Sequence, residues 1–229
     1  MTKAHFTKAR QRTLDHLRDA GIEHHMLHGP ASDDYWSAPL RVLAVNMESY
    51  GYDDCGHWEV DLACLLDWMY DRGGTDTKTV RYTLAIIKTL TDAHASSIAP
   101  CPEHLRTAYA DGPSLEAVLR QSAYYNIRPT SNPEKPEDAT SIVASGSTPL
   151  SEFVRDEMLA LAPHVILVSG HSGLAAFNAM WRLDPPLTYL GSIRHSCGTV
   201  IQSIRHPSRP NYTAFATTIS NALQQLNAA

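Results

Sequence analysis

Three side chains with complementary chemistry each lie at or just after a short apolar run of the chain: Glu48, Asn126 and His206. A carboxylate can orient water or stabilise a positive charge, and an imidazole can move a proton near neutral pH. The amide of Asn126 can both donate and accept, which suits the Watson–Crick edge of a pyrimidine. Together these groups predict a pocket for a nucleotide base.

Groups that could hold the rest of a nucleotide lie close to these residues in the sequence. Ser208 follows a stiffening proline and offers a hydroxyl and a backbone N–H to a phosphate, and Arg205 and Arg209 flank this segment. Taken singly, each group has an ordinary structural explanation, and only their combination favours a binding pocket. The aromatic side chains that could stack on a base follow the carboxylate: Tyr50, Tyr52 and Trp58.

Four apolar runs rich in branched residues predict the strands that position these groups, at 41–46, 123–127, 164–170 and 199–204. Helical segments alternate with these runs. We therefore expect an α/β fold of three layers (α/β/α) with a short, four-stranded, mostly parallel sheet. Ligands of such sheets bind beyond the carboxyl ends of the strands, so the segments that carry the chemistry are predicted to meet at one site.

The chain is predicted to form a single domain over residues 1–229. Residues 1–40 form an N-terminal helix and loop, and a helical insert at about 59–121 separates the first two strands. The stretch at 128–149 is rich in proline and serine and is predicted to be a loop. A helix at about 213–226 closes the chain.

Charge is distributed unevenly along the chain. The net charge is −5, from 19 basic and 24 acidic residues, which argues against a protein that coats nucleic acid by bulk charge. Residues 185–229 contain no acid and carry +3, so the rest of the chain carries −8. We expect an anionic ligand near this acid-free part, with its phosphates in contact with the three arginines there: Arg194, Arg205 and Arg209.

The sequence predicts a cytoplasmic protein without a metal or other cofactor. The N-terminal segment lacks the apolar core of a signal peptide, and no stretch is long and apolar enough to cross a bilayer, so we expect no membrane partner. His24, His25 and His28 could bind a metal, but adjacent histidines in a polar loop are usually solvated. No Cys-x-x-Cys pair occurs, and four free thiols are predicted: Cys55, Cys64, Cys101 and Cys197.

The order of these segments resembles the uracil-DNA glycosylase superfamily over about residues 41–227. The stretch IRHPSRPNYTAF (204–215) is similar to the family's His-Pro-Ser motif, which also lies between the last strand and the last helix. YYNI (124–127) resembles the strand with the base-reading asparagine. HVILVSGHSGLAAF (164–177) resembles the third strand and its small-residue turn, and RVLAVNMESYG (41–51) occupies the place of the water-activating motif.

The resemblance implies a divergent DNA glycosylase that hydrolyses the N-glycosidic bond of a flipped uracil or modified pyrimidine and leaves an abasic site. It implies that His206 stabilises charge on the leaving base and that Asn126 reads the base edge. Glu48 stands where the family positions the attacking water, and Asn46 is the other candidate for that role. The remaining implied contacts are Tyr50 and Trp58 with the base, and Ser208, Arg209, Arg205 and Ser172 with DNA. DNA is the implied partner, and we expect a monomer without an obligatory protein partner.

Departures from the family leave the identity of the base open. The loop motifs Gly-Gln-Asp-Pro-Tyr and Gly-Met-Asn-Pro of the uracil-specific branches are absent, and Asn-Met-Glu-Ser-Tyr (46–50) stands there instead. The altered loop and the long insert keep a glycosylase for hypermodified cytosine in phage DNA as an alternative, in defence rather than repair. The cysteine pattern of the iron–sulfur branches is missing, so no cluster is expected.

Three other classes remain open. A hydrolase of free nucleosides or nucleotides would need the same pocket, and a binding module on this fold would need no catalysis, although Glu48 and His206 together argue against it. A serine hydrolase could use Ser172, which lies in a strand-turn-helix segment near the nucleophile-elbow pattern. Leu174 stands where that pattern requires glycine, and the acid would have to be Asp184, so this class is disfavoured.

Overall fold

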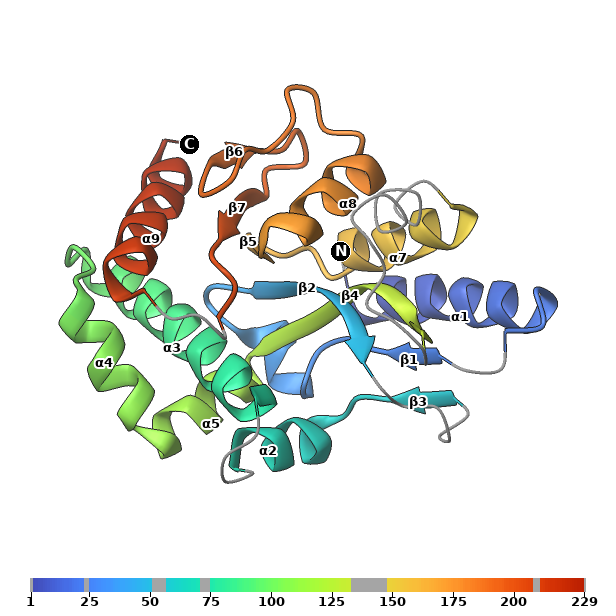
Figure 1. Cartoon of the computed structure of the whole chain (residues 1–229), viewed down its shortest axis with the longest axis horizontal. Helices are drawn as coiled ribbons and strands as arrows, with labels where there is room; N and C mark the ends of the chain where they lie inside the picture. Colours follow the sequence, from blue (N-terminus) through green and yellow to red (C-terminus); the bar gives the residue numbers. More distant parts are fainter. Residues whose placement is uncertain are drawn as a thin grey trace.

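The computed structural model describes residues 2–22, 25–50, 57–70, 75–132, 148–207 and 211–228, in which helices enclose a five-stranded sheet (Figure 1). In spatial order the strands are β4 (Ser122–Asn132), β2 (Val42–Tyr50), β5 (Val165–Ser169), β7 (Val200–Ile204) and β6 (Ser192–Arg194). The first four are parallel, and β6 pairs with β7 in the antiparallel sense. The predicted α/β fold with a mostly parallel sheet is confirmed, whereas the predicted number of four strands is wrong.

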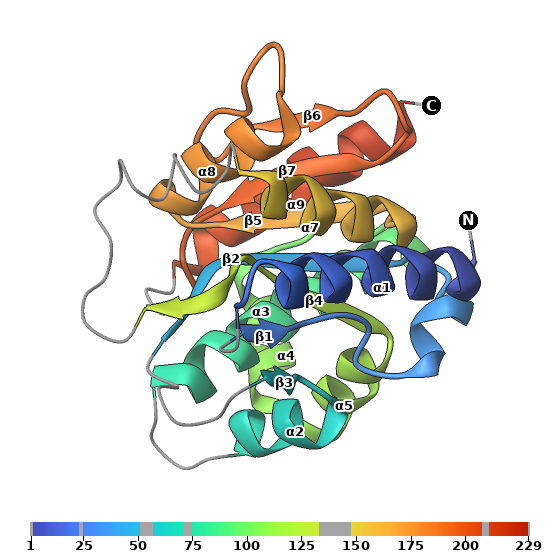
Figure 2. The same ribbon diagram turned by 90° about the vertical axis from the view of Figure 1, so that its right-hand side faces the viewer.

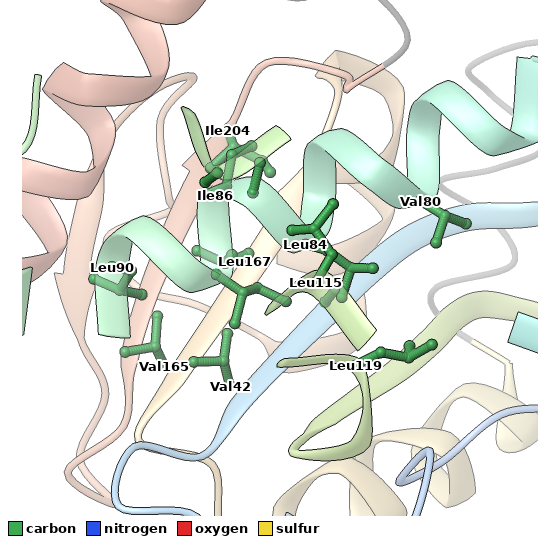
Figure 3. Close-up of a cluster of buried hydrophobic side chains, with 14 of the residues drawn as sticks. Val42, Val80, Leu84, Ile86, Leu90, Leu115, Leu119, Val165, Leu167 and Ile204 are labelled. Carbon is green, nitrogen blue, oxygen red and sulfur yellow. The ribbon is translucent and has the colours of Figure 1, made fainter. Parts of the chain in front are cut away.

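Apolar side chains alternate between the two faces of the sheet, as the pleat of a strand requires. Val42 and Ala44 of β2 lie on what we call the first face. Leucines of two helices gather there with Val42, Val165 and Leu167 of the sheet (Figure 3). The helices of the first face are α2 (Leu62–Tyr70), α3 (Thr75–Ser96), α4 (Pro102–Ala110), α5 (Gly112–Arg120) and α9 (Tyr212–Asn227).

Leu43 and Val45 of β2 point the other way, onto the second face. Phe177 is fully buried there and stacks on Trp181, with 5.2 Å between ring centroids. The elements of this face are the 3₁₀ helix η1 (Asp33–Ser37) and the helices α1 (Lys3–Asp19), α7 (Pro149–Ala160) and α8 (His171–Trp181). Figure 2 shows α1 beside α7 on this side of the sheet.

A buried ionic network fixes α1 to α7 and β4. Arg10 Nε donates to Glu157 Oε2 at 2.8 Å, and Arg10 Nη2 donates to the hydroxyl of Tyr125 at 3.0 Å. The Tyr125 hydroxyl donates in turn to the same Glu157 oxygen. Glu157 is 1% exposed. Burial alone would lower the pKa of Arg10, but Tyr125 and Glu157 raise it above its usual value, so the guanidinium stays charged.

The segment after α1 covers the outer edge of β4. A short strand β1 (His25–Leu27) pairs in parallel with β3 (His57–Glu59). The next residues then run antiparallel to β4: Tyr124 N–H donates to the carbonyl of Gly29 at 2.9 Å, and Ala31 N–H donates to the carbonyl of Ser122 at 3.0 Å. The N-terminal segment therefore protects the hydrogen-bonding groups of an edge strand.

Two predicted loops are partly strand. The sequence also predicts a loop at 47–58, and this segment contains the last residues of β2 and the first two residues of β3, His57 and Trp58. The loop predicted from residue 128 begins with the end of β4. Glu48 pairs with Arg128 and Tyr50 with Asn132, with a bulge between the two pairs. Residues 48–50 and 128–132 are extended because they pair with each other, and β3 is extended because it pairs with β1. Neither predicted loop has an apolar pattern of its own.

Three of the four predicted free thiols are confirmed, namely Cys64, Cys101 and Cys197. Cys55 lies outside the described residues. Burial, together with the charges of Asp61 and Asp67, raises the pKa of Cys64 to about 11, so this side chain remains a thiol at neutral pH. In the part of the chain that the structure describes, no helix has the length and apolar character to span a membrane.

Candidate functional site

The chain leaves the neighbouring strands β2 and β5 toward opposite faces of the sheet. After β2 it enters α2 to α5 on the first face, and after β5 it enters α8 on the second. In open α/β sheets, ligands bind beyond the carboxyl ends of the strands at such a switch point. Pairing between β2 and β5 stops at Val45 and Val168, whereas β2 stays paired with β4 as far as Tyr50 and Asn132. The sheet therefore divides directly after Val45 and Val168.

Three polar residues form a row across the sheet at this point of division: Asn126 of β4, Asn46 of β2 and Ser169 of β5, hereafter the polar row. Asn126 is the register partner of Asn46, and Ser169 follows the last residue of β5 that pairs with β2. Alternation along the strands assigns all three side chains to the first face. Asn126 is 8% exposed and Ser169 is 1% exposed, whereas Asn46 is half-buried, so the row is shielded from water at its two ends.

Two atoms of the polar row have no hydrogen-bond partner among the described residues. They are the amide oxygen Oδ1 of Asn46 and the hydroxyl Oγ of Ser169, and both atoms are buried. A buried polar atom without a partner costs about 1–3 kcal/mol, and native proteins satisfy most such atoms. A ligand with matching donors and acceptors would remove this cost, which makes the polar row a candidate binding site.

The third member of the row contacts a histidine from the N-terminal segment. Nδ2 of Asn126 lies 3.4 Å from Nε2 of His28, and His28 is only 6% exposed. The prediction that this histidine is solvated is therefore wrong, because residues 29–31 pair with β4 and bring His28 against it. Among the described residues, no group of three or more His, Cys, Asp or Glu side chains could hold a metal ion.

His206 lies against the turn that joins β5 to α8. Gly170 forms this turn, and its N–H donates to the carbonyl of Ile204, at the end of β7, at 3.0 Å. A methyl group on Gly170 would lie 3.5 Å from Cδ2 and 3.7 Å from Cβ of His206. Since Gly170 directly follows Ser169, the structure brings the half-buried imidazole to the same edge of the sheet as the polar row.

Gly170 has a backbone conformation that only glycine adopts readily, with φ 75° and ψ 168°. We expect Gly170→Ala to lower the free energy of unfolding by about 1–3 kcal/mol, measured by urea denaturation. Gly112→Ala is the matched control, because Gly112 has no positive φ and its added methyl group would make an ordinary contact at 3.8 Å with Tyr70. Equal losses in the two variants would contradict the proposed strain at Gly170.

The same turn bears on the serine-hydrolase alternative. In a nucleophile elbow the serine itself occupies the strained turn between strand and helix. Here the positive φ belongs to Gly170, and Ser172 is the second residue of α8. The backbone therefore lacks the feature that would present Ser172 as a nucleophile.

The structure describes the other predicted site residues only in part. Arg205 is half-buried and directly follows β7. Glu48 and Tyr50 belong to β2, Trp58 to β3 and Ser172 to α8, but their side chains lie outside what the structure describes. Tyr52, Ser208 and Arg209 lie outside the described residues altogether.

Arg194 does not lie where the charge pattern predicts. It is on β6, opposite Val200 at the amino end of β7, and its Nη1 donates to the carbonyl of Gln225 near the end of α9 at 2.8 Å. The candidate site is at the carboxyl end of β7, so Arg194 lies at the opposite end of this strand from Arg205.

Ser169 and His28 are two members of the candidate site that the sequence did not assign to it, since His28 was considered only as one of three possible metal ligands. Ser169 could have been found from sequence, because it is a polar residue that ends an apolar run and directly precedes a glycine. No comparable signal marks His28 as a neighbour of Asn126, because this contact depends on pairing between distant segments.

No family model, no curated protein and no solved structure matches this chain.

Proposed function

We propose that the chain is a DNA glycosylase with a uracil-DNA glycosylase-like fold. It would hydrolyse the N-glycosidic bond of a flipped uracil or modified pyrimidine and leave an abasic site. The observation that carries this proposal is the polar row at the switch point of the sheet, where buried atoms of Asn46 and Ser169 lack partners among the described residues. The resemblance of the segments around Asn126 and His206 to that superfamily adds to it.

The edge of a pyrimidine base would supply the missing hydrogen bonds. Oδ1 of Asn46 can only accept, the hydroxyl of Ser169 can do either, and the amide of Asn126 presents one donor group and one acceptor. Pyrimidines offer carbonyl oxygens, ring N–H groups and amino groups along a single edge. A base inside a duplex cannot reach buried side chains, so the target base would have to be flipped out of the stack.

The proposed chemistry separates charge between the sugar and the base. Cleavage of the bond develops an oxocarbenium-like sugar and a negative charge on the leaving base. In this mechanism His206, which lies beside the turn at Gly170, stabilises that negative charge. The backbone N–H groups at the start of α8, which directly follows this turn, add to the stabilisation. Glu48 or Asn46 orients the attacking water and favours the positive sugar.

The remaining contacts would hold the DNA strand. Ser208, Arg205, Arg209 and Ser172 would contact the backbone, with Arg209 entering the gap left by the flipped base, and Tyr50 and Trp58 would stack on the base. The protein would act in the cytoplasm as a monomer, with no cofactor and no protein partner. Few phosphate contacts predict a shallow dependence of DNA binding on salt.

Measurement of base release tests the proposal. The protein is incubated with single- and double-stranded oligonucleotides that carry uracil or modified cytosines. Free bases are identified by mass spectrometry, and abasic sites are detected as strand breaks after alkali. We expect one base to be released and its site to break, and Ser172→Ala to retain this activity. No release from any oligonucleotide would contradict the proposal, and release from free nucleosides alone would favour a nucleoside hydrolase.

A further inference from the structure

We propose that His28 is a positioning residue that determines which side of the Asn126 amide faces the base. The side chain of asparagine presents a donor, Nδ2, and an acceptor, Oδ1, and a half-turn about its last torsion exchanges them. The two orientations recognise opposite patterns on a base edge. The inference deepens the proposed function and rests on it for the identity of the ligand, while the contact between the two side chains can be measured independently.

The chemistry of the contact determines the state of the imidazole. Nδ2 of Asn126 lies 3.4 Å from Nε2 of His28. An amide nitrogen can only donate, so Nε2 must accept, and the imidazole must be neutral with its proton on Nδ1. Both residues are buried, at 6% and 8% exposure, so exchange of this contact for water is costly.

Contacts of the main chain hold His28 in place. Its carbonyl accepts from Nη2 of Arg10, whose guanidinium is paired with the buried Glu157. The following residues are bonded to β4 through Gly29 and Ala31. None of these bonds uses the imidazole, so substitutions of the His28 side chain leave them intact, and the backbone of such a variant keeps its course beside Asn126.

The consequence concerns which bases can be recognised. Nδ2 and Oδ1 diverge from the same carbon, so directing Nδ2 toward His28 also fixes the direction of Oδ1. Because Oδ1 is an acceptor, a base that binds to it must be the hydrogen-bond donor, and the ring N3–H of uracil is such a donor. Methylation of N3 removes that donor. His28 would therefore favour bases with a donor at this edge, and loss of its acceptor would let the amide turn and relax the preference.

Nitrogen NMR of the full-length protein tests the contact without any substrate. Two-bond ¹H–¹⁵N spectra report which ring nitrogen of a histidine carries the proton, and His28→Gln assigns the His28 signals. We expect a neutral His28 protonated on Nδ1 in the wild type. In Asn126→Asp a carboxylate would face Nε2, and we expect that nitrogen to become protonated. A wild-type ring protonated on Nε2, or an unchanged ring in Asn126→Asp, would overturn the proposal.

A pair of variants tests the effect on specificity. His28→Gln retains an acceptor for Nδ2, whereas His28→Leu removes it. For oligonucleotides with uracil or 3-methyluracil, we expect His28→Leu to lower the ratio of the two kcat/KM values roughly tenfold and His28→Gln to preserve most of it. Equal loss of both activities in both variants, at unchanged thermal stability, would overturn the positioning role. Absence of base release by the wild-type protein would instead overturn the proposed function, and the NMR result would still decide the contact.

Discussion

Replacement of His206 by alanine is expected to slow single-turnover base release by about two orders of magnitude or more. The imidazole contacts the turn at Gly170, directly after Ser169 of the polar row, so it can stabilise charge on a base bound there. Release is measured with enzyme in excess over a labelled oligonucleotide, so that product dissociation does not limit the rate. His195→Ala is the matched control, because His195 is also half-buried but lies before β7, at the opposite end of the sheet.

Glu48→Gln is expected to reduce the same rate by a similar factor, since it removes the charge that would favour the positive sugar. Asn46→Ala compares the two candidates for orienting water, and the residue with that role shows the larger loss. Full activity in both His206→Ala and Glu48→Gln would contradict the assigned roles. Wild-type activity in His195→Ala, beside a strong loss in His206→Ala, would tie the effect to the carboxyl edge of the sheet.

The second large effect concerns stability: Arg10→Ala is expected to lower the free energy of unfolding by about 3–5 kcal/mol. The substitution removes the cation that pairs with Glu157, which is 1% exposed, and with the hydroxyl of Tyr125. A buried carboxylate without its partner keeps the whole cost of desolvation. Urea denaturation measures the loss.

Arg12→Ala provides a close control from the same helix. Arg12 pairs with Asp156 at 3.2 Å, so it also joins α1 to α7, but the two side chains are 51% and 36% exposed. Exposed pairs contribute about 0–1 kcal/mol, and we expect a loss in that range. A triple variant replaces the buried network by apolar side chains: Arg10→Met, Glu157→Leu and Tyr125→Phe. We expect this variant to have a higher free energy of unfolding than Arg10→Ala, because it leaves no buried charge without a partner. Equal losses in Arg10→Ala and Arg12→Ala would contradict the importance of burial.

The central strands could be predicted from sequence because each contains branched apolar residues, as in Val165–Val168 of β5 and Val200, Ile201 and Ile204 of β7. All five residues of β5 and of β7 are buried, which is the environment that such runs require. β6 was missed for the opposite reason. Its three residues, Ser192 to Arg194, have no apolar pattern of their own, and they form a strand because they pair with the edge of β7. Local sequence carries little information about pairing of that kind.

The same distinction applies to the site. Asn126 could be predicted as a member of the candidate site, since it is a polar residue near the end of an apolar run, and Asn46 lies in register with it. His28 could not, because its burial depends on antiparallel pairing of residues 29–31 with β4. From sequence alone, three histidines in a polar segment are expected to be solvated. Only the pairing of the following residues with β4 shows that His28 is buried. The location of Arg194 likewise depends on pairing, since β6 places it opposite Val200 at the amino end of β7.

The bond between Arg10 and Glu157 joins residues that are 147 positions apart in the chain. On a ribosome, α1 is complete long before α7 emerges, and at typical rates of synthesis the delay is on the order of ten seconds. Throughout that time α1 has only the weak stability of an isolated helix. The N-terminal segment is thus made early and docked late, and this interval is when the nascent chain is most accessible to chaperones and proteases.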